Sequence, residues 1–229
     1  MGLSHSPKIV TNGLVLCLDA GNTKSYPGSG TAWTDLSGYG RNGTLVNGVT
    51  YSSDNKGCMT FDGVNDYAVV DTNVYYNYDK EITVVSWLKF TAFNYILSQA
   101  VKNSDTMSNN VWLWHATANG LIWYVNDAGS WKSTSYSSLT IGTWYQIVTT
   151  ASASNILIYV NANQVATGSG ITTNILNASN SQIATNDNRY ADDRVPHGGN
   201  ISSIQIYNRV LSATEIQQNF TALRGRYGI

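Results

Sequence analysis

The sequence predicts an all-β protein, a sandwich or barrel of short antiparallel strands. Segments in which apolar and polar residues alternate recur along the chain, turn residues separate them, and no helical period of apolar residues precedes Ser212. Hydrophobic residues make up 42% of the 229 residues, which is enough to bury a substantial core. Because sandwiches of this length commonly remain single, we expect one domain over residues 1–229.

The first half of the chain contains three strand regions and one long loop. Residues 14–19 alternate and give a first strand with one strongly apolar face. Residues 21–48 are dense in Gly, Ser, Asn and Thr and are predicted as an ordered loop. Residues 59–70 are expected to form two strands joined by a turn at Asp62-Gly63, and residues 82–90 form the clearest buried strand.

The second half continues as a meander. Residues 112–125 are expected to form a hairpin around Asn119-Gly120, the strongest short hairpin signal in the sequence. Residues 144–150 and 156–166 supply two further strands, and isoleucines alternate in the closing strand at 201–206.

One short helix is predicted after this last strand. Ser212 and Glu215 have the spacing of a capping box, so the helix should begin there. Ile216, Phe220 and Leu223 then lie on its buried stripe.

Charge is scarce in this chain. Only 12% of the residues are charged, the net charge is −1 and the pI is near 6.2. This composition argues against binding to nucleic-acid phosphates and against anchoring on anionic membranes. The polar surface must therefore consist of Asn, Ser, Thr, Gln and Tyr, which suits hydrogen bonding to neutral partners.

Residues 1–8 lack the apolar run of a signal peptide, so we expect a protein made in a cytoplasm. Cys17 and Cys58 each lie in an apolar strand pattern and are expected to be buried free thiols.

Four segments together resemble a laminin-G-like domain of the concanavalin A-like lectin/glucanase superfamily. They occur in the family's order and cover most of the chain: 61–67 (FDGVNDY), 144–148 (WYQIV), 158–161 (IYVN) and 198–216 (GGNISSIQIYNRVLSATEI). The resemblance implies a concanavalin A-like jelly-roll sandwich of two antiparallel sheets with one short C-terminal helix.

The same resemblance implies a structural calcium ion, held by an acid near the first strand and one in the last. Asp19 and Asp35 match the early positions. The Ile-Asp-Asp of many relatives is Ile201-Ser202-Ser203 here, and this departure removes charge from the later position.

Glycoside hydrolysis, the enzyme activity found in the superfamily, needs two carboxylates facing one cleft. The chain has only two glutamates, Glu81 and Glu215, and Glu215 is assigned to the helix cap. The single acidic pair at i,i+2 spacing is Asp79 and Glu81, which precedes a strand instead of lying within it. We therefore predict no catalytic residues and no enzyme activity.

Aromatic residues suggest binding instead. In the predicted hairpin, Trp112, Trp114 and Trp123 share one face, and Trp131 follows closely. A row of indoles on a sheet suits stacking against the apolar C–H faces of sugar rings. The alternative is that the indoles fill the sandwich core, where Trp is usually found.

The most polar segment, residues 185–197, is a second candidate site. Arg189 and Tyr190 could contact a glycan, and Asp187 and Asp192 could hold calcium, which takes six to eight oxygen ligands. A salt-bridged surface loop is the alternative.

Residues 6–16 and 218–229 resemble stand-alone proteins encoded by tailed phages, especially marine ones. This resemblance implies a virion-surface protein, for capsid decoration or tail adhesion, present in many copies or as a homo-oligomer. Its partners would be other virion proteins and a host-surface glycan, and residues 224–227 are expected to reach a neighbouring subunit. The alternative function is a polysaccharide-active glycoside hydrolase with a divergent site.

Overall fold

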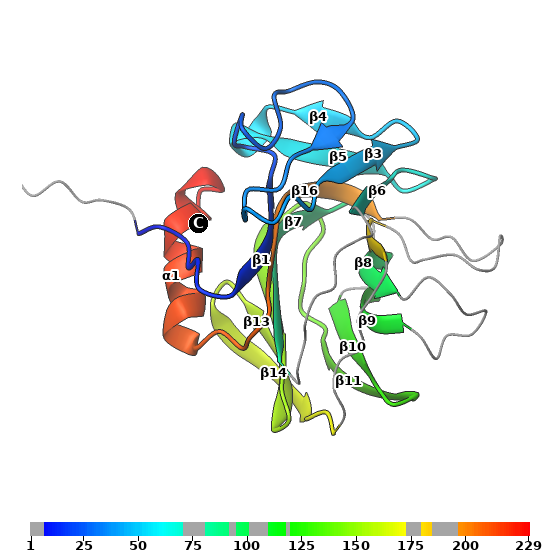
Figure 1. Cartoon of the computed structure of the whole chain (residues 1–229), viewed down its shortest axis with the longest axis vertical. Helices are drawn as coiled ribbons and strands as arrows, with labels where there is room; N and C mark the ends of the chain where they lie inside the picture. Colours follow the sequence, from blue (N-terminus) through cyan, green and yellow to red (C-terminus); the bar gives the residue numbers. More distant parts are fainter. Residues whose placement is uncertain are drawn as a thin grey trace, which may run out of the picture.

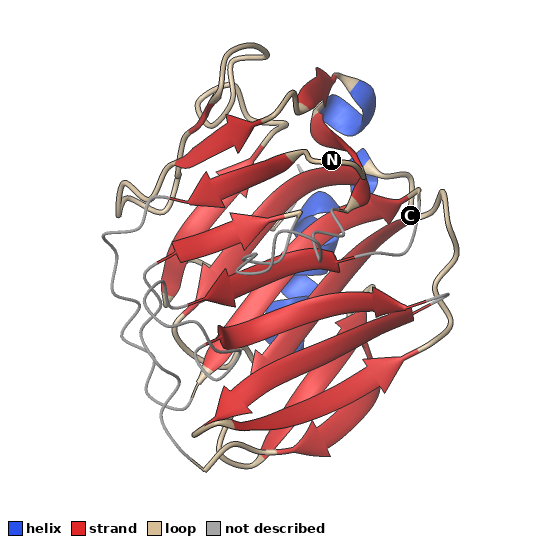
Figure 2. Cartoon of the chain, turned by 90° about the vertical axis from the view of Figure 1, so that its right-hand side faces the viewer, coloured by secondary structure: helices blue, strands red, loops and turns tan. Residues whose placement is uncertain are grey.

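The protein is a sandwich of two antiparallel sheets, called sheet A and sheet B here. The computed structural model describes residues 7–70, 81–91, 95–100, 110–117, 120–172, 180–184 and 197–229. Figure 1 shows the two sheets packed face to face, with the helix α1 on the far side of sheet A. Figure 2 looks onto sheet B, with the helix behind both layers.

Sheet A is built around the long strand β16. In spatial order its strands are β14 (Asn163–Ser169), β13 (Asn155–Val160), β12 (Trp144–Ala151), β7 (Ile82–Phe90), β16 (Gly198–Tyr207), β5 (Cys58–Asp62) and β4 (Thr50–Ser52), and β1 (Leu14–Asp19) also pairs with β16. Neighbours in space are often distant in sequence, which gives the crossovers of a jelly-roll-like fold.

Sheet B forms the second layer. In spatial order its strands are β11 (Ser130–Tyr136), β10 (Gly120–Asp127), β9 (Asn110–Thr117), β8 (Tyr95–Ala100), β15 (Asn180–Ile183), β6 (Tyr67–Val70), β3 (Gly43–Val46) and β2 (Ala32–Trp33). The edge strands β11 and β14 of the two sheets lie side by side. Gly168 of β14 permits this approach, because a Cβ atom there would lie 2.8 Å from the carbonyl oxygen of Ser133.

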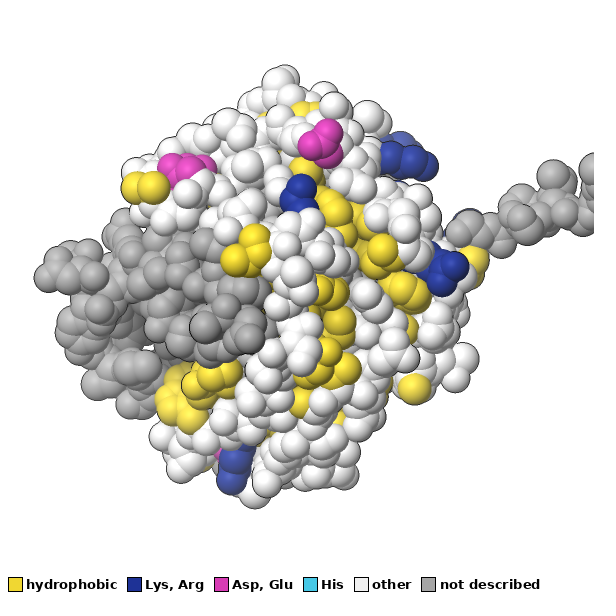
Figure 3. Space-filling model, turned by 180° about the vertical axis from the view of Figure 1, so that it is seen from behind, with side chains coloured by type: hydrophobic (Ala, Val, Ile, Leu, Met, Phe, Trp, Pro, Cys, Tyr) yellow, Lys and Arg dark blue, Asp and Glu magenta, His cyan; other side chains and the backbone are white. Residues whose placement is uncertain are grey.

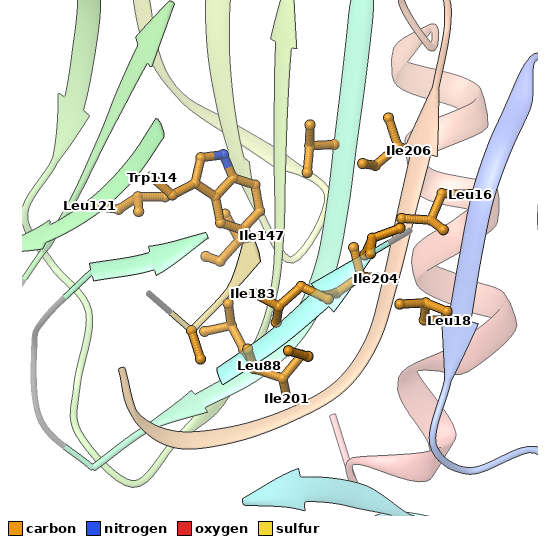
Figure 4. Close-up of a cluster of buried hydrophobic side chains, with 14 of the residues drawn as sticks. Leu16, Leu18, Leu88, Trp114, Leu121, Ile147, Ile183, Ile201, Ile204 and Ile206 are labelled. Carbon is orange, nitrogen blue, oxygen red and sulfur yellow. The ribbon is translucent and has the colours of Figure 1, made fainter. Parts of the chain in front are cut away.

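The space between the sheets is filled by a single apolar core. Its members come from both layers and are almost fully buried, including Leu16, Leu18, Leu88, Trp114, Leu121, Ile147, Ile183, Ile201, Ile204 and Ile206 (Figure 4). Burying this apolar surface is the main force that holds the two layers together.

A bulge in β16 explains how three of these isoleucines face the same layer. Ile201 and Ile204 are three residues apart, so a regular strand would point them to opposite faces. The register shifts between Ile201 and Ser203, which pair with the consecutive β7 residues Leu88 and Trp87. The extra residue turns the side chains of Ile204 and Ile206 back towards the core, as for Ile201. All three isoleucines are at most 2% exposed.

The predicted helix is confirmed as α1 (Ala213–Leu223). The Ser212 hydroxyl accepts from the backbone N–H of Glu215, and the Glu215 carboxylate accepts from the backbone N–H of Ser212. Ile216 and Phe220 are buried against the outer face of sheet A, and Leu223 packs beside them.

The chain after α1 is also packed against sheet A. A 3-10 turn, η3 (Arg224–Arg226), leads to Tyr227, which is 7% exposed and stacks on Trp87 with ring centroids 4.1 Å apart. The Tyr227 ring is therefore enclosed by its own chain, whereas Arg224 and Gly225 are exposed. The expectation that residues 224–227 reach a neighbouring subunit stays a prediction.

The strands predicted from sequence are present, with two kinds of difference. Residues 21–48, predicted as a loop, also contain the strands β2 and β3. Four further strands were not predicted from the sequence: β4, β8, β11 and β15. A second 3-10 turn, η1 (Asp54–Lys56), joins β4 to β5.

Cys17 and Cys58 are buried free thiols as predicted, and burial raises the pKa of Cys17 to about 12. The described residues contain no helix with the length and apolarity required to cross a bilayer.

Candidate functional site: aromatic residues on the outer face of sheet B

Three consecutive strands of sheet B carry the four tryptophans singled out in the sequence. The β9–β10 hairpin is confirmed, with Trp123 opposite Trp114 and Val125 opposite Trp112. This register places the three indole positions on one face, as predicted. Leu121 pairs with Ala116 in this hairpin.

That face is the inner one, so the core interpretation holds for two of the three indoles. Trp114 and Trp123 are fully buried between the sheets, with ring centroids 6.4 Å apart and ring planes at 81°. Their N–H groups reach across to sheet A, where Trp114 Nε1 donates to Thr149 Oγ1 at 2.9 Å and Trp123 Nε1 donates to the Thr150 carbonyl at 3.3 Å. The prediction that Trp114 and Trp123 stack on sugars is therefore wrong. The side chain of Trp112 lies outside the described residues.

Trp131 has the exposure that a binding residue needs. It lies on the edge strand β11 opposite Asn126, and its ring is half-buried. The half-buried ring of Tyr124 lies 6.0 Å from it, centroid to centroid, with the ring planes at 83°. Trp131 and Tyr124 thus form an aromatic corner with solvent access on the outer face of sheet B.

Register defines the other members of this surface. Ser133 lies opposite Tyr124, and Ser135 lies opposite Ile122, so these residues share the face of Trp131. Both serines are exposed and Ile122 is half-buried. We call the set Ile122, Tyr124, Trp131, Ser133 and Ser135 the Trp131 patch. It offers apolar ring surface next to hydroxyl groups that donate and accept hydrogen bonds.

A tight turn fixes the corner. Asp127 pairs with Ser130, so only Ala128 and Gly129 connect β10 to β11, and both have positive φ, 52° and 88°. This is the requirement of a type I′ hairpin turn. The Asn126 side chain caps the turn by accepting from the Gly129 N–H at 2.7 Å.

The carboxylate at this turn is turned away from the patch. Asp127 is 5% exposed and accepts from the backbone N–H of Thr172 at 2.9 Å and from its hydroxyl. Lys132 Nζ lies 4.0 Å from Asp127 Oδ2. Lys132 pairs with the buried Val125, which places it on the face opposite to Trp131.

The first predicted calcium ligand, Asp19, is paired with a cation of the protein itself. Arg226 Nη1 donates to both Asp19 oxygens at 2.9 and 3.1 Å. The same guanidinium donates to Ser202 Oγ at 2.9 Å and to the Asn55 carbonyl at 3.4 Å. Asp19 therefore does not fit a calcium site in this arrangement, because a guanidinium already occupies its carboxylate.

The second predicted ligand, Asp35, organises a loop. Its Oδ1 accepts from the backbone N–H groups of Cys17 and Ser37 at 2.8 and 2.9 Å. Its Oδ2 accepts from the Ser37 hydroxyl at 2.6 Å and from the backbone N–H of Arg41 at 3.1 Å. These donors leave no free carboxylate oxygen for a cation. Across the described part of the chain, no group of three or more His, Cys, Asp or Glu side chains could hold a metal ion.

The loop candidates Arg189, Tyr190, Asp187 and Asp192 lie outside the described residues. Their predicted roles in glycan and calcium binding stay predictions.

The side chains of the two glutamates have structural partners. Glu215 forms an ion pair with Arg209 at 2.6 Å, and this hydrogen bond lowers the pKa of Glu215 to about 2, the opposite of what a general acid needs. Glu81 is exposed and accepts from the Val210 N–H at 3.3 Å.

Asp62 and Asp66 do lie close together, but they shape the β5–β6 turn. Asp66 Oδ2 accepts from the Asp62 N–H at 3.1 Å, and Asp62 Oδ1 accepts from the Val64 N–H at 2.8 Å. Burial raises the pKa of Asp66, whereas the hydrogen bond from Val64 lowers the pKa of Asp62.

Sequence reasoning missed Tyr124 and Arg226. Alternation along the strand puts Tyr124 on the face opposite to Trp123. The sequence did not show that β11 would pair with β10 and bring Trp131 next to Tyr124. Nothing local marks Arg226, because its partners come from β1, β16 and η1.

Comparison with known proteins agrees with this architecture. A family model described as the concanavalin A-like lectin/glucanases superfamily matches residues 62–217. No curated protein matches the sequence at a significant level.

Several solved structures share the fold. The receptor-binding domain of botulinum neurotoxin type G has a TM-score of 0.67 and 18% identity over 91% of this chain and 51% of its own. The binding domain of botulinum neurotoxin DC in complex with SialylT has a TM-score of 0.71 and 15% identity over 93% and 52%. Botulinum neurotoxin type C, whose uptake into cells depends upon interaction with two ganglioside molecules, has a TM-score of 0.70 and 18% identity over 93% and 52%. This chain spans about half the length of these proteins, and at such identities the likeness establishes the fold.

Proposed function

Because the chain belongs to the concanavalin A-like lectin/glucanases superfamily, we propose that it is a non-catalytic carbohydrate-binding protein that holds a sugar against the Trp131 patch. The observation that carries the proposal is the aromatic corner of Trp131 and Tyr124, half-buried beside exposed serine hydroxyls. Aromatic rings with an apolar face and nearby polar groups match the alternating C–H and O–H surface of a sugar.

The fold neighbours support this choice by analogy. One of them is described in complex with SialylT and another as dependent on gangliosides for cell entry, and both kinds of ligand contain sugars. The surface of this chain is also suited to sugars, since Figure 3 shows a broken band of hydrophobic side chains among uncharged ones, with few Lys and Arg.

The arrangement of the described carboxylates supports a non-catalytic role. A glycosidase needs two carboxylates across one sugar-binding cleft, one of them with a raised pKa. Glu215 has a lowered pKa and serves a helix cap, and the Asp62–Asp66 pair serves a turn.

We further propose that the protein acts on the surface of a phage virion, in many copies, bound to other virion proteins and facing a host glycan. The support is the resemblance of residues 6–16 and 218–229 to phage proteins. A site that contacts one sugar binds weakly, so display in many copies would raise the avidity. Mass spectrometry of purified particles tests this, and absence of the protein from them would exclude the location.

The binding site is tested by Trp131→Ala in the full chain, assayed by calorimetry or a glycan array against soluble oligosaccharides. Loss of the stacking ring should weaken binding about tenfold, equivalent to ~1.4 kcal/mol. The melting temperature should change little, because the ring lies at a sheet edge.

Tyr39→Ala is the matched control, since Tyr39 is a 60% exposed aromatic away from the patch. It should leave sugar binding unchanged. Equal binding by wild type and Trp131→Ala, or binding to no sugar at all, would contradict the proposal.

A further inference from the structure

The geometry of the aromatic corner limits what can lie on it. The planes of Trp131 and Tyr124 meet at 83°, so a ligand that stacks on one ring meets the edge of the other. Two rings that bind successive sugars of an extended chain must instead present roughly coplanar faces. The corner therefore accommodates one sugar ring, with one aromatic face beneath it and the other ring as a wall.

The charged side chains near the corner lie on the other face of sheet B. Lys132 and Asp127 are the charged residues of β10 and β11, and they approach each other at 4.0 Å on the side away from Trp131. Asp127 is further held by Thr172. The Trp131 patch itself consists of two aromatic side chains, one aliphatic side chain and two serines.

The sequence around this site is also uncharged over an unusual length. No Lys, Arg, Asp or Glu occurs from Ser133 to Asn186, a stretch that holds most of β11 and all of β12, β13, β14 and β15. A net charge of −1 could be reached with charges spread evenly, so this gap is a local property of the sequence. The described cation of β10 and β11, Lys132, lies on the face opposite to Trp131.

An acidic sugar would be disfavoured at such a site. Its carboxylate or sulfate would lose water without gaining an ion pair from the described side chains of β10 and β11 on this face, and it would lie against aromatic faces, which carry partial negative charge. Neutral hydroxyls, in contrast, can exchange hydrogen bonds with Ser133 and Ser135, which both donate and accept.

We propose that the Trp131 patch selects a single neutral sugar ring, in preference to sialylated or sulfated sugars and to the flat face of an extended polysaccharide. This inference rests on the proposed carbohydrate-binding function and names its ligand class. It sets this chain apart from those fold neighbours that are described with sialylated ligands and gangliosides.

The test compares matched probes on the full chain by tryptophan fluorescence or NMR titration. Lactose and 3′-sialyllactose differ by one acidic sugar, and each is titrated at low and at physiological salt. The neutral probe should bind at least tenfold more tightly, with an affinity that salt does not change. Lengthening a neutral oligosaccharide from two to four sugars should change the affinity less than threefold.

A gain-of-charge variant sharpens the test. Ser133→Arg places a guanidinium on the patch and should raise the affinity for 3′-sialyllactose about tenfold, in a salt-sensitive manner. Ser138→Arg is the matched control, since Ser138 is an exposed serine in the loop before β12, and it should have no such effect. Melting curves of both variants check that the fold is retained.

The outcomes separate this inference from the function on which it rests. Equal or tighter binding of 3′-sialyllactose by the wild type overturns the preference for neutral sugars but leaves carbohydrate binding standing. Affinity that rises steadily with chain length overturns the single-ring site. Binding of neither probe, and of no neutral oligosaccharide, overturns both proposals.

Discussion

His197 is a fully buried imidazole in an aromatic setting at the start of β16. Phe90 packs edge-on at 5.7 Å and Phe61 lies at 6.4 Å, and neither ring nitrogen has a hydrogen-bond partner in the described structure. Burial lowers the pKa of His197 to about 3, from an ordinary value of 6.5. The folded protein therefore keeps the ring neutral at pH values where the unfolded chain protonates it.

The sign of the pH effect follows from this lowered pKa. The stability that His197 contributes is complete above pH 6.5 and is lost as the pH falls from 6.5 towards 3, by at most about 1.4 kcal/mol per pH unit. We predict that His197→Leu flattens this part of the stability curve, measured by urea unfolding at pH 7, 6, 5 and 4. Parallel curves for wild type and variant would show that His197 does not titrate in this range.

Arg226 is the residue that joins the C-terminal segment to the first and last strands. Its guanidinium contacts Asp19, Ser202 and the Asn55 carbonyl, and its side chain is 10% exposed. Arg226→Met keeps the apolar stem but leaves the Asp19 carboxylate without its cation. We expect a loss of about 2–3 kcal/mol in the free energy of unfolding.

Arg224→Met provides the comparison, because Arg224 lies in the same 3-10 turn and is exposed. It should cost less than about 0.5 kcal/mol. The double variant Asp19→Asn with Arg226→Met should be more stable than Arg226→Met alone, since no unpaired carboxylate remains. Similar losses from both arginine variants would refute the special role of Arg226.

At the scale of elements, the β10–β11 turn contains a strained backbone conformation that a substitution should relieve. Ala128 is exposed and has a φ of 52°, a conformation that an L residue with a Cβ adopts at a cost of roughly 1–2 kcal/mol. Ala128→Asn should stabilise the protein by up to about 1 kcal/mol, because Asn tolerates this region. Ala128→Val should destabilise it, and equal effects in chemical unfolding would argue against a type I′ turn here.

Elements with strong local signals were predictable, and those defined by pairing were not. The capping box at Ser212 and the buried strand 82–90 each follow from their own residues. Strand β11 is polar and serine-rich, so only its ladder with β10 reveals it. Likewise, β2 and β3 lie in a Gly- and Ser-rich stretch and become strands by pairing with each other and with β6.

The candidate site shows the same limit at residue level. Alternation correctly grouped Trp112, Trp114 and Trp123 on one face, but it could not say which face the second sheet covers. The burial of Trp114 and Trp123 depends on Thr149 and Thr150 in β12, which are distant in sequence. Once that face is inward, Tyr124 and Trp131 must be outward.

At the scale of the whole molecule, the remaining metal prediction concerns residues 185–197. Asp19 and Asp35 have partners in the chain itself, so a structural calcium ion would depend on Asp187 and Asp192. This segment leads into β16, the strand that pairs with β1, β5 and β7. Restraining the start of such a central strand would oppose unfolding of all of sheet A.

We therefore propose that calcium stabilises the molecule as a whole. Calcium at a hundredfold excess over its Kd should add about 2.7 kcal/mol to the free energy of unfolding, which raises the melting temperature by roughly 5–10 °C. Asp187→Asn combined with Asp192→Asn should abolish this shift, whereas Asp54→Asn, an exposed acid in η1, should retain it. A melting temperature that neither a chelator nor added calcium changes would exclude the ion.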